Sequence, residues 1–144
     1  MAKILIVDDE KSIRTTLREI LEYEKYVVDE AEDGEKGLRK LLNNYYDVVL
    51  LDIKMPKKDG LEVLEAMKMA DLDTPAIMIS GHGNLETAVE SVKNGAFDYI
   101  AKPPDLNRLL ITIRNALDKS NLITETKVLK RKVTKTRDIV YRKL

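Results

Sequence analysis

The residues that could do chemistry together in this 144-residue sequence are Asp8, Asp9, Asp52, Ser80 and Lys102. Each of them ends or directly follows a short apolar run of the kind that forms a buried strand. In a parallel sheet the carboxyl ends of the strands open on the same edge. We therefore expect three carboxylates, one hydroxyl and one ammonium group to converge on one pocket.

Such a pocket favours metal-assisted phosphoryl chemistry. Three close carboxylates repel one another and raise each other's pKa unless a cation is present. Oxygen ligands without His or Cys favour a hard ion such as Mg²⁺. A carboxylate beside that ion can attack a phosphoryl group. The ion and Lys102 would stabilise the transferring charge, and Ser80 would donate a hydrogen bond to the product. Taken singly, each residue has an ordinary explanation as a cap or loop residue, and only the joint pattern indicates chemistry.

The elements that must position these residues alternate along the chain. Apolar runs predict strands over residues 4–7, 26–31, 48–51, 75–80 and 97–101. Helical periodicity predicts helices over 13–21, 34–44, 61–69, 85–92 and 106–117. In the second of these helices we expect Leu38, Leu41 and Leu42 to face inward. This alternation predicts an α/β fold with a doubly wound parallel sheet, helices on both faces and right-handed crossovers.

Composition limits the classes of protein that fit. An apolar content of 44% is enough for the core of one domain with a short extension. One Phe and no Trp predict an aliphatic core, with the six Tyr residues mostly near the surface. The absence of Cys excludes disulfides, thiolate metal sites and a cysteine nucleophile. The first apolar run is too short for a signal peptide or a membrane span, so we expect a cytoplasmic protein.

Charge divides the chain into two parts. Residues 119–144 carry nine Lys or Arg against two acidic residues, whereas residues 1–118 carry 16 basic and 23 acidic residues. Opposite charges suggest two roles. We predict a domain over 1–118 and a charged helical linker over 119–144, in which Leu122 and Leu129 begin a broken heptad-like pattern. The linker lacks a nucleic-acid-reading motif, and the chain contains no phosphate-binding Gly-x-x-x-x-Gly-Lys-Ser/Thr loop.

Several motifs together resemble the receiver domains of two-component response regulators, over about residues 3–118. They are Val7-Asp8-Asp9-Glu10, Leu50-Leu51-Asp52-Ile53-Lys54-Met55-Pro56, Asp59-Gly60, Ser80 and Lys102-Pro103. The resemblance implies a flavodoxin-like (βα)5 sheet with strand order 2-1-3-4-5. It also implies Mg²⁺-dependent transfer of a phosphoryl group from a sensor histidine kinase, and a two-state switch of the surface formed by the fourth helix, fifth strand and fifth helix.

The resemblance also implies a role for each matching residue. Asp52 matches the phosphoacceptor, Ser80 matches the switch hydroxyl, and Lys102 matches the lysine that pairs with the phosphate. Asp9 matches the direct Mg²⁺ ligand, Asp8 matches a ligand that binds through water, and the backbone carbonyl of Lys54 matches the third protein ligand. Tyr99 matches the aromatic switch, although it could equally be an ordinary strand aromatic. Lys54 and His82 occupy positions that tune dephosphorylation; His82 could instead be a plain surface loop residue.

A narrower resemblance concerns residues 80–89 and 95–103, which are similar to receivers of NtrC/NtrX-type activators. Those proteins join the receiver to an ATPase domain and a DNA-binding domain, and the linker often helps to form a homodimer. We therefore expect this chain to be part of a longer transcription activator, with no direct contact to nucleic acid or membrane. Pro104 departs from the pattern, because a bulky apolar residue commonly follows Lys-Pro there.

Two other functions share part of this pattern. One is a haloacid-dehalogenase-type phosphatase, which also uses a strand-end Asp and Mg²⁺; its Asp-x-Asp motif is not matched by Asp52-Ile53-Lys54. The other is a stand-alone or degenerate receiver that serves as a dimerisation module. A degenerate receiver requires a missing site residue, and none is missing. We expect no enzyme activity beyond phosphorylation and dephosphorylation of the chain itself.

Overall fold

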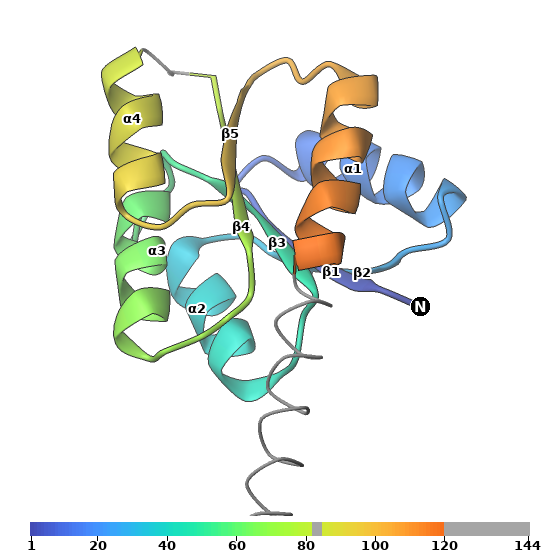
Figure 1. Cartoon of the computed structure of the whole chain (residues 1–144). Helices are drawn as coiled ribbons and strands as arrows, with labels where there is room; N and C mark the ends of the chain where they lie inside the picture. Colours follow the sequence, from blue (N-terminus) through green and yellow to red (C-terminus); the bar gives the residue numbers. More distant parts are fainter. Residues whose placement is uncertain (82–84, 120–144) are drawn as a thin grey trace, which may run out of the picture.

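The computed structural model of the chain describes residues 1–81 and 85–119 (Figure 1). Its five strands are β1 (Lys3–Val7), β2 (Val27–Ala31), β3 (Val48–Asp52), β4 (Ala76–Ser80) and β5 (Asp98–Ala101). All neighbouring strands pair in parallel, in the order β2-β1-β3-β4-β5. The predicted doubly wound sheet and its strand order are confirmed.

Helices cover both faces of this sheet. They are α1 (Lys11–Tyr23), α2 (Gly34–Asn43), α3 (Gly60–Met69), α4 (Leu85–Lys93) and a helix over 106–119. In Figure 1, α1 and the orange 106–119 helix lie on one side of the sheet, and α2, α3 and α4 lie on the other. The chain therefore has three layers, with the sheet in the middle.

Each face of the sheet has its own core, because successive strand side chains point to opposite faces. On β1, Ile4 and Ile6 pack with α1 and the 106–119 helix. Leu5 and Val7 pack with buried residues of α2 and α3. These four residues are at most 1% exposed. With both faces covered, the central strands β1, β3 and β4 are apolar over most of their length, and polar residues come at or just after their carboxyl ends.

The turn after β3 is fixed by the start of α3. Asp59 and Glu62 form a capping box, in which each side chain accepts a hydrogen bond from the backbone of the other residue. The Gly60 amide donates to the carbonyl oxygen of Ile53 at 2.7 Å. The loop after Asp52 is therefore closed tightly against the end of its own strand.

Two residues depart from the expected burial. Leu42 is 53% exposed, whereas Leu41 is buried as predicted. Tyr46 is 1% exposed, unlike the surface tyrosines Tyr23 and Tyr45. Its hydroxyl donates to Asp29 Oδ2 at 2.6 Å, and this hydrogen bond allows a polar group to be buried.

Helix α4 forms where the sequence predicts it, but its apolar positions lie outside the core. Leu85, Val89 and Val92 are 79%, 43% and 56% exposed, and the buried residue of the helix is Ser91. The Ser91 hydroxyl donates to the Thr87 carbonyl oxygen at 2.9 Å, which satisfies it inside the helix. The apolar stripe of α4 is thus a surface feature of the described chain.

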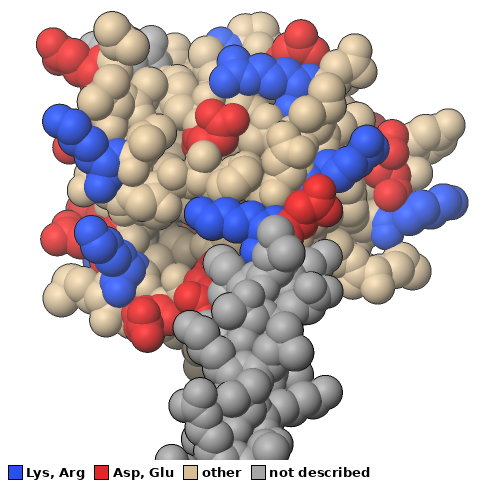
Figure 2. Space-filling view, viewed as in Figure 1, with Lys and Arg blue, Asp and Glu red and all other residues tan. Residues whose placement is uncertain are grey.

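Charged side chains are interspersed on the face shown in Figure 2, where Lys and Arg alternate with Asp and Glu. No helix among residues 1–81 and 85–119 is both long enough and apolar enough to cross a membrane. The predicted linker beyond residue 119 and the predicted rate-tuning residue His82 lie outside the described residues.

Candidate functional site

The polar residues singled out in the sequence lie at one edge of the sheet. The strands are in register there: Val7 pairs with Leu51, Asp52 with Ile79, and Ser80 with Ala101. Asp8, Asp52 and Ser80 are 3%, 6% and 1% exposed. Each extends a strand that is apolar up to that point, so strand length alone places the polar groups at the common edge.

Lys102 lies between two of the carboxylates. Its Nζ is 2.8 Å from Asp8 Oδ2 and 3.5 Å from Asp52 Oδ2, and its side chain is 14% exposed. Burial lowers the pKa of Lys102, but the hydrogen bond and charge of Asp8, followed by those of Asp52, outweigh this effect and leave the pKa raised. The group is therefore a fixed positive charge that ties the end of β5 to the end of β1.

Asp52 titrates close to neutral pH. Burial raises its pKa, and the negative charges of Asp8 and Asp9 add to this, while Lys102 opposes it; the result is a pKa of about 6. Burial and like charges both penalise the ionised carboxyl. The one ammonium group of Lys102, which Asp8 shares, does not offset the burial of Asp52 and the repulsion from Asp8 and Asp9.

The acids that follow β1 form a compact group. Asp8, Asp9 and Glu10 each place a carboxylate oxygen within 4.8 Å of the others; Asp8 is buried, and Asp9 and Glu10 are exposed. The Glu10 amide donates to Asp8 Oδ1 at 2.9 Å. Oxygen ligands alone, beside a buried carboxyl with a raised pKa, are a donor set that fits a hard divalent cation such as Mg²⁺. Glu10 was not among the predicted ligands, although it is the next residue in the same acidic run.

The other predicted residues surround this group less closely. Tyr99 is half-buried on β5 and packs against the core on the α2 and α3 side of the sheet. Its hydroxyl is buried, and no hydrogen-bond partner for it exists among the described residues. Lys54 is exposed in the loop after β3, and Gly81 is exposed directly after Ser80.

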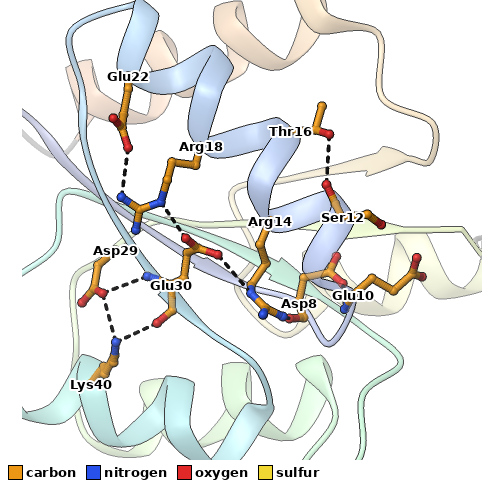
Figure 3. Close-up of polar contacts among 10 residues, drawn as sticks. All are labelled: Asp8, Glu10, Ser12, Arg14, Thr16, Arg18, Glu22, Asp29, Glu30 and Lys40. Carbon is orange, nitrogen blue, oxygen red and sulfur yellow. Dashed lines mark hydrogen bonds and ion pairs between the residues drawn. The ribbon is translucent and has the colours of Figure 1, made fainter.

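Two positioning residues were missed by sequence reasoning. A Cβ atom on Gly60 would lie 2.2 Å from the carbonyl oxygen of Asp52, so any side chain at this position would force the backbone to shift. The Asp59-Gly60 motif carried that signal. Arg14 donates from Nη1 to the carbonyl oxygen of Asp8 at 2.7 Å, as Figure 3 shows. The sequence pattern gave no signal for this contact, because it joins a helix side chain to a strand-end carbonyl.

Comparison with known proteins agrees with this geometry. The response regulator receiver domain family matches residues 4–114. The chain is 41% identical over 121 residues to the transcriptional regulatory protein DltR of Streptococcus agalactiae, covering 84% of this chain and 54% of DltR. It is 40% identical over 129 residues to the nitrogen assimilation regulatory protein NtrX of Azorhizobium caulinodans, covering 88% of this chain and 28% of NtrX.

A solved structure of NtrX from Brucella abortus, in complex with ADP, has a similar fold. The TM-score is 0.83 with 37% sequence identity, and the match covers 93% of this chain and 30% of that one. The predicted resemblance to NtrX-type receivers is confirmed. This chain spans about half, or less, of the length of these relatives.

Proposed function

This chain belongs to the response regulator receiver domain family, and we propose that Asp52 accepts a phosphoryl group from the phosphohistidine of a sensor histidine kinase. The observation that carries the proposal is the position of the Asp52 carboxyl. It is 6% exposed at the end of β3, 3.5 Å from the ammonium group of Lys102, and next to the acids that follow β1.

The chemistry balances without further reactants. An Asp52 carboxylate oxygen attacks phosphorus, and the bond between phosphorus and the kinase imidazole breaks; the imidazole leaves as a neutral group because its other ring nitrogen already carries a proton. The product is an acyl phosphate on Asp52. Lys102 is near enough to pair first with the Asp52 carboxylate and then with the phosphoryl oxygens, and its contact with Asp8 holds the ammonium group in position.

Asp8, Asp9, Asp52 and the backbone carbonyl of Lys54 would hold Mg²⁺. When bound, Mg²⁺ neutralises charge on the phosphoryl oxygens. Three carboxylates, those of Asp8, Asp9 and Asp52, face the one ammonium group of Lys102, and this charge balance supports a bound cation. Glu10 belongs to the same acidic group and would add to its negative field.

Phosphorylation would act as a switch. Ser80 lies one residue beyond the partner of Asp52 on β4, from which its hydroxyl can turn to the phosphoryl group. Tyr99 would move with it, and the unpartnered Tyr99 hydroxyl supports a side chain that is not locked in one position. The surface of α4, β5 and the 106–119 helix would then change. Its exposed apolar residues Val89 and Val92 support a protein partner there.

We also propose a domain organisation and a role for the residues outside the phosphorylation site. Residues 1–118 form the receiver domain, and residues 119–144, nearly all of which lie outside the described residues, link it to ATPase and DNA-binding output domains in a longer transcription activator of the NtrC type. The activator works as a homodimer in the cytoplasm. Lys54 and His82 tune the rate of dephosphorylation, and the domain has no other substrate than its own Asp52. The similarity to NtrX, of which this chain covers 28%, supports this assignment.

Intact-mass spectrometry after incubation with acetyl phosphate and Mg²⁺ tests the proposal. We expect one phosphate adduct, absent from the Asp52→Asn variant and absent when EDTA replaces Mg²⁺. No adduct from acetyl phosphate or from a phosphorylated histidine kinase would contradict it and leave a dimerisation module. Continuous release of phosphate from small phosphate esters would point instead to a phosphatase.

A further inference from the structure

Arg14 bridges the acidic loop after β1 to the edge strand β2. Its Nη1 donates to the Asp8 carbonyl oxygen at 2.7 Å, and its Nε donates to Glu30 Oε1 at 3.0 Å. The side chain is only 12% exposed. In Figure 3 the guanidinium group lies between the two acceptors, reaching from α1 across the end of β1. The planar fork of arginine allows both hydrogen bonds at once.

Glu30 is itself held from the other side. Arg18, one helical turn after Arg14, donates from Nε to Glu30 Oε2 at 2.6 Å and from Nη1 to Glu22 Oε1 at 2.9 Å. Glu30 therefore accepts one arginine on each carboxylate oxygen, so the Oε1 that pairs with Arg14 is not shared with Arg18.

The contact with Arg14 completes the anchoring of Asp8. The Asp8 amide donates to the Ala31 carbonyl oxygen at 3.1 Å, and the Asp8 carboxylate accepts from the Glu10 amide and from Lys102. The carbonyl of Asp8 begins the peptide that leads to Asp9. The Arg14 backbone amide also donates to the Glu10 carbonyl oxygen at 3.1 Å. That backbone hydrogen bond is the first of α1, and the Arg14 side chain holds the Asp8 end of the loop.

We propose that Arg14 is a positioning residue for the cation site, which fixes the backbone of residues 8–10 so that their carboxylates converge. The inference rests on the proposed function. It gives a partly buried arginine outside the pocket a role in the affinity for Mg²⁺, through the loop rather than through contact with the ion. Groups that orient metal ligands commonly contribute about 10- to 100-fold to affinity.

The structure offers a matched control. Arg18 pairs with the same carboxylate, but its hydrogen bonds go to Glu30 and Glu22 rather than to the loop. Arg14→Lys keeps the charge but can no longer reach both Glu30 and the Asp8 carbonyl with one planar group. Arg18→Lys also keeps the charge, and it changes only the ion pairs with Glu30 and Glu22. Both variants are made in the full 144-residue chain, and thermal unfolding confirms that each is folded at the temperature of the assay.

Isothermal titration with Mg²⁺ alone is the primary measurement. We expect the Kd of Arg14→Lys to rise about tenfold and that of Arg18→Lys to stay within about twofold of wild type. The Glu10 amide resonance should shift in metal-free Arg14→Lys and not in Arg18→Lys. In the acetyl phosphate assay, Arg14→Lys should need more Mg²⁺ for half-maximal rate but reach the wild-type rate at saturation.

An unchanged Kd in Arg14→Lys would overturn the inference. An equal loss in both variants would also overturn it, because it would mean that the ion-pair network stabilises the fold without positioning the loop. If wild type binds Mg²⁺ and Arg14→Lys weakens it, but no adduct forms on Asp52, the proposed function fails and the positioning role of Arg14 stands. Wild-type protein that binds no Mg²⁺ would overturn both.

Discussion

The ammonium group of Lys102 lies 2.8 Å from Asp8 Oδ2, a contact between residues 94 positions apart. It joins the ends of β5 and β1, which are separated in the sheet by β3 and β4. Asp52 lies along this path and is left with the longer contact, at 3.5 Å. The acceptor carboxyl is thus close to a positive charge that another carboxylate holds more tightly.

Removing this lysine should destabilise the protein in a pH-dependent way. In Lys102→Met the buried carboxylates of Asp8 and Asp52 lose their shared partner, and the free energy of unfolding at pH 7.5 should fall by about 2–4 kcal/mol. The loss should be smaller at pH 5, because protonation relieves the repulsion. Urea unfolding at both pH values measures it. Lys36→Met, which removes a surface pair with Glu32, should have little effect; equal losses in the two variants would refute the prediction.

The raised pKa of Asp52 predicts how the metal-free protein responds to pH. Folding raises this pKa from 3.8 to about 6, so the folded state favours the protonated carboxyl. That stabilisation is fully present below pH 3.8 and is lost as pH rises through 6. The side chain of Asp52→Asn cannot titrate. The free energy of unfolding of this variant, relative to that of wild type, should therefore increase by about 2–3 kcal/mol between pH 4 and pH 7.5. Urea unfolding in EDTA measures both proteins, and parallel pH profiles would show that the pKa is not raised.

The close approach of Gly60 to the acceptor strand predicts a steric effect. A methyl group there would lie 2.2 Å from the Asp52 carbonyl oxygen and 2.8 Å from Ile53 Cα, so the loop after β3 would have to move. Gly60→Ala should cost about 1–3 kcal/mol and slow phosphorylation. Gly81→Ala is the control, because its Cβ would meet only Lys102 side-chain atoms at 3.7 Å or more. Thermal unfolding compares them, and similar melting temperatures would contradict the prediction.

Two buried tyrosine hydroxyls predict effects of opposite sign. The Tyr99 hydroxyl has no hydrogen-bond partner within residues 1–81 and 85–119, so Tyr99→Phe should stabilise the unphosphorylated protein by about 1 kcal/mol. The Tyr46 hydroxyl donates to Asp29, so Tyr46→Phe should destabilise it by about 1.5–3 kcal/mol. Chemical denaturation gives both values. A loss of stability in Tyr99→Phe would mean that its hydroxyl has a partner in solution.

The fold and the edge that carries the site could be predicted because both depend on local pattern. Apolar runs set the strands, and each run ends at the polar residue that reaches the sheet edge; Asp8, Asp52 and Ser80 follow directly. The strand order follows from the resemblance to receiver domains and agrees with the structure. The boundaries of β2, β4 and β5 differ from the prediction by one residue at the start.

The features that could not be predicted depend on what packs across space. Helical periodicity identifies Leu85, Val89 and Val92 as one face of α4, but it does not say whether another element covers that face, and here it is exposed. The contact of Arg14 with the Asp8 carbonyl depends on a rotamer that Glu30 selects from another strand. Neither the exposure of the α4 face nor the Arg14 contact corresponds to a fixed spacing in the sequence, so neither could be predicted from it.

Locating the phosphoryl group tests the central claim most directly. The protein is phosphorylated with acetyl phosphate and Mg²⁺, reduced with borohydride to convert the acyl phosphate to homoserine, digested and sequenced by tandem mass spectrometry. We predict homoserine at position 52 and at no other Asp or Glu. Homoserine at position 8 or 9 with an unmodified Asp52 would contradict the account, because it would make a proposed cation ligand the acceptor.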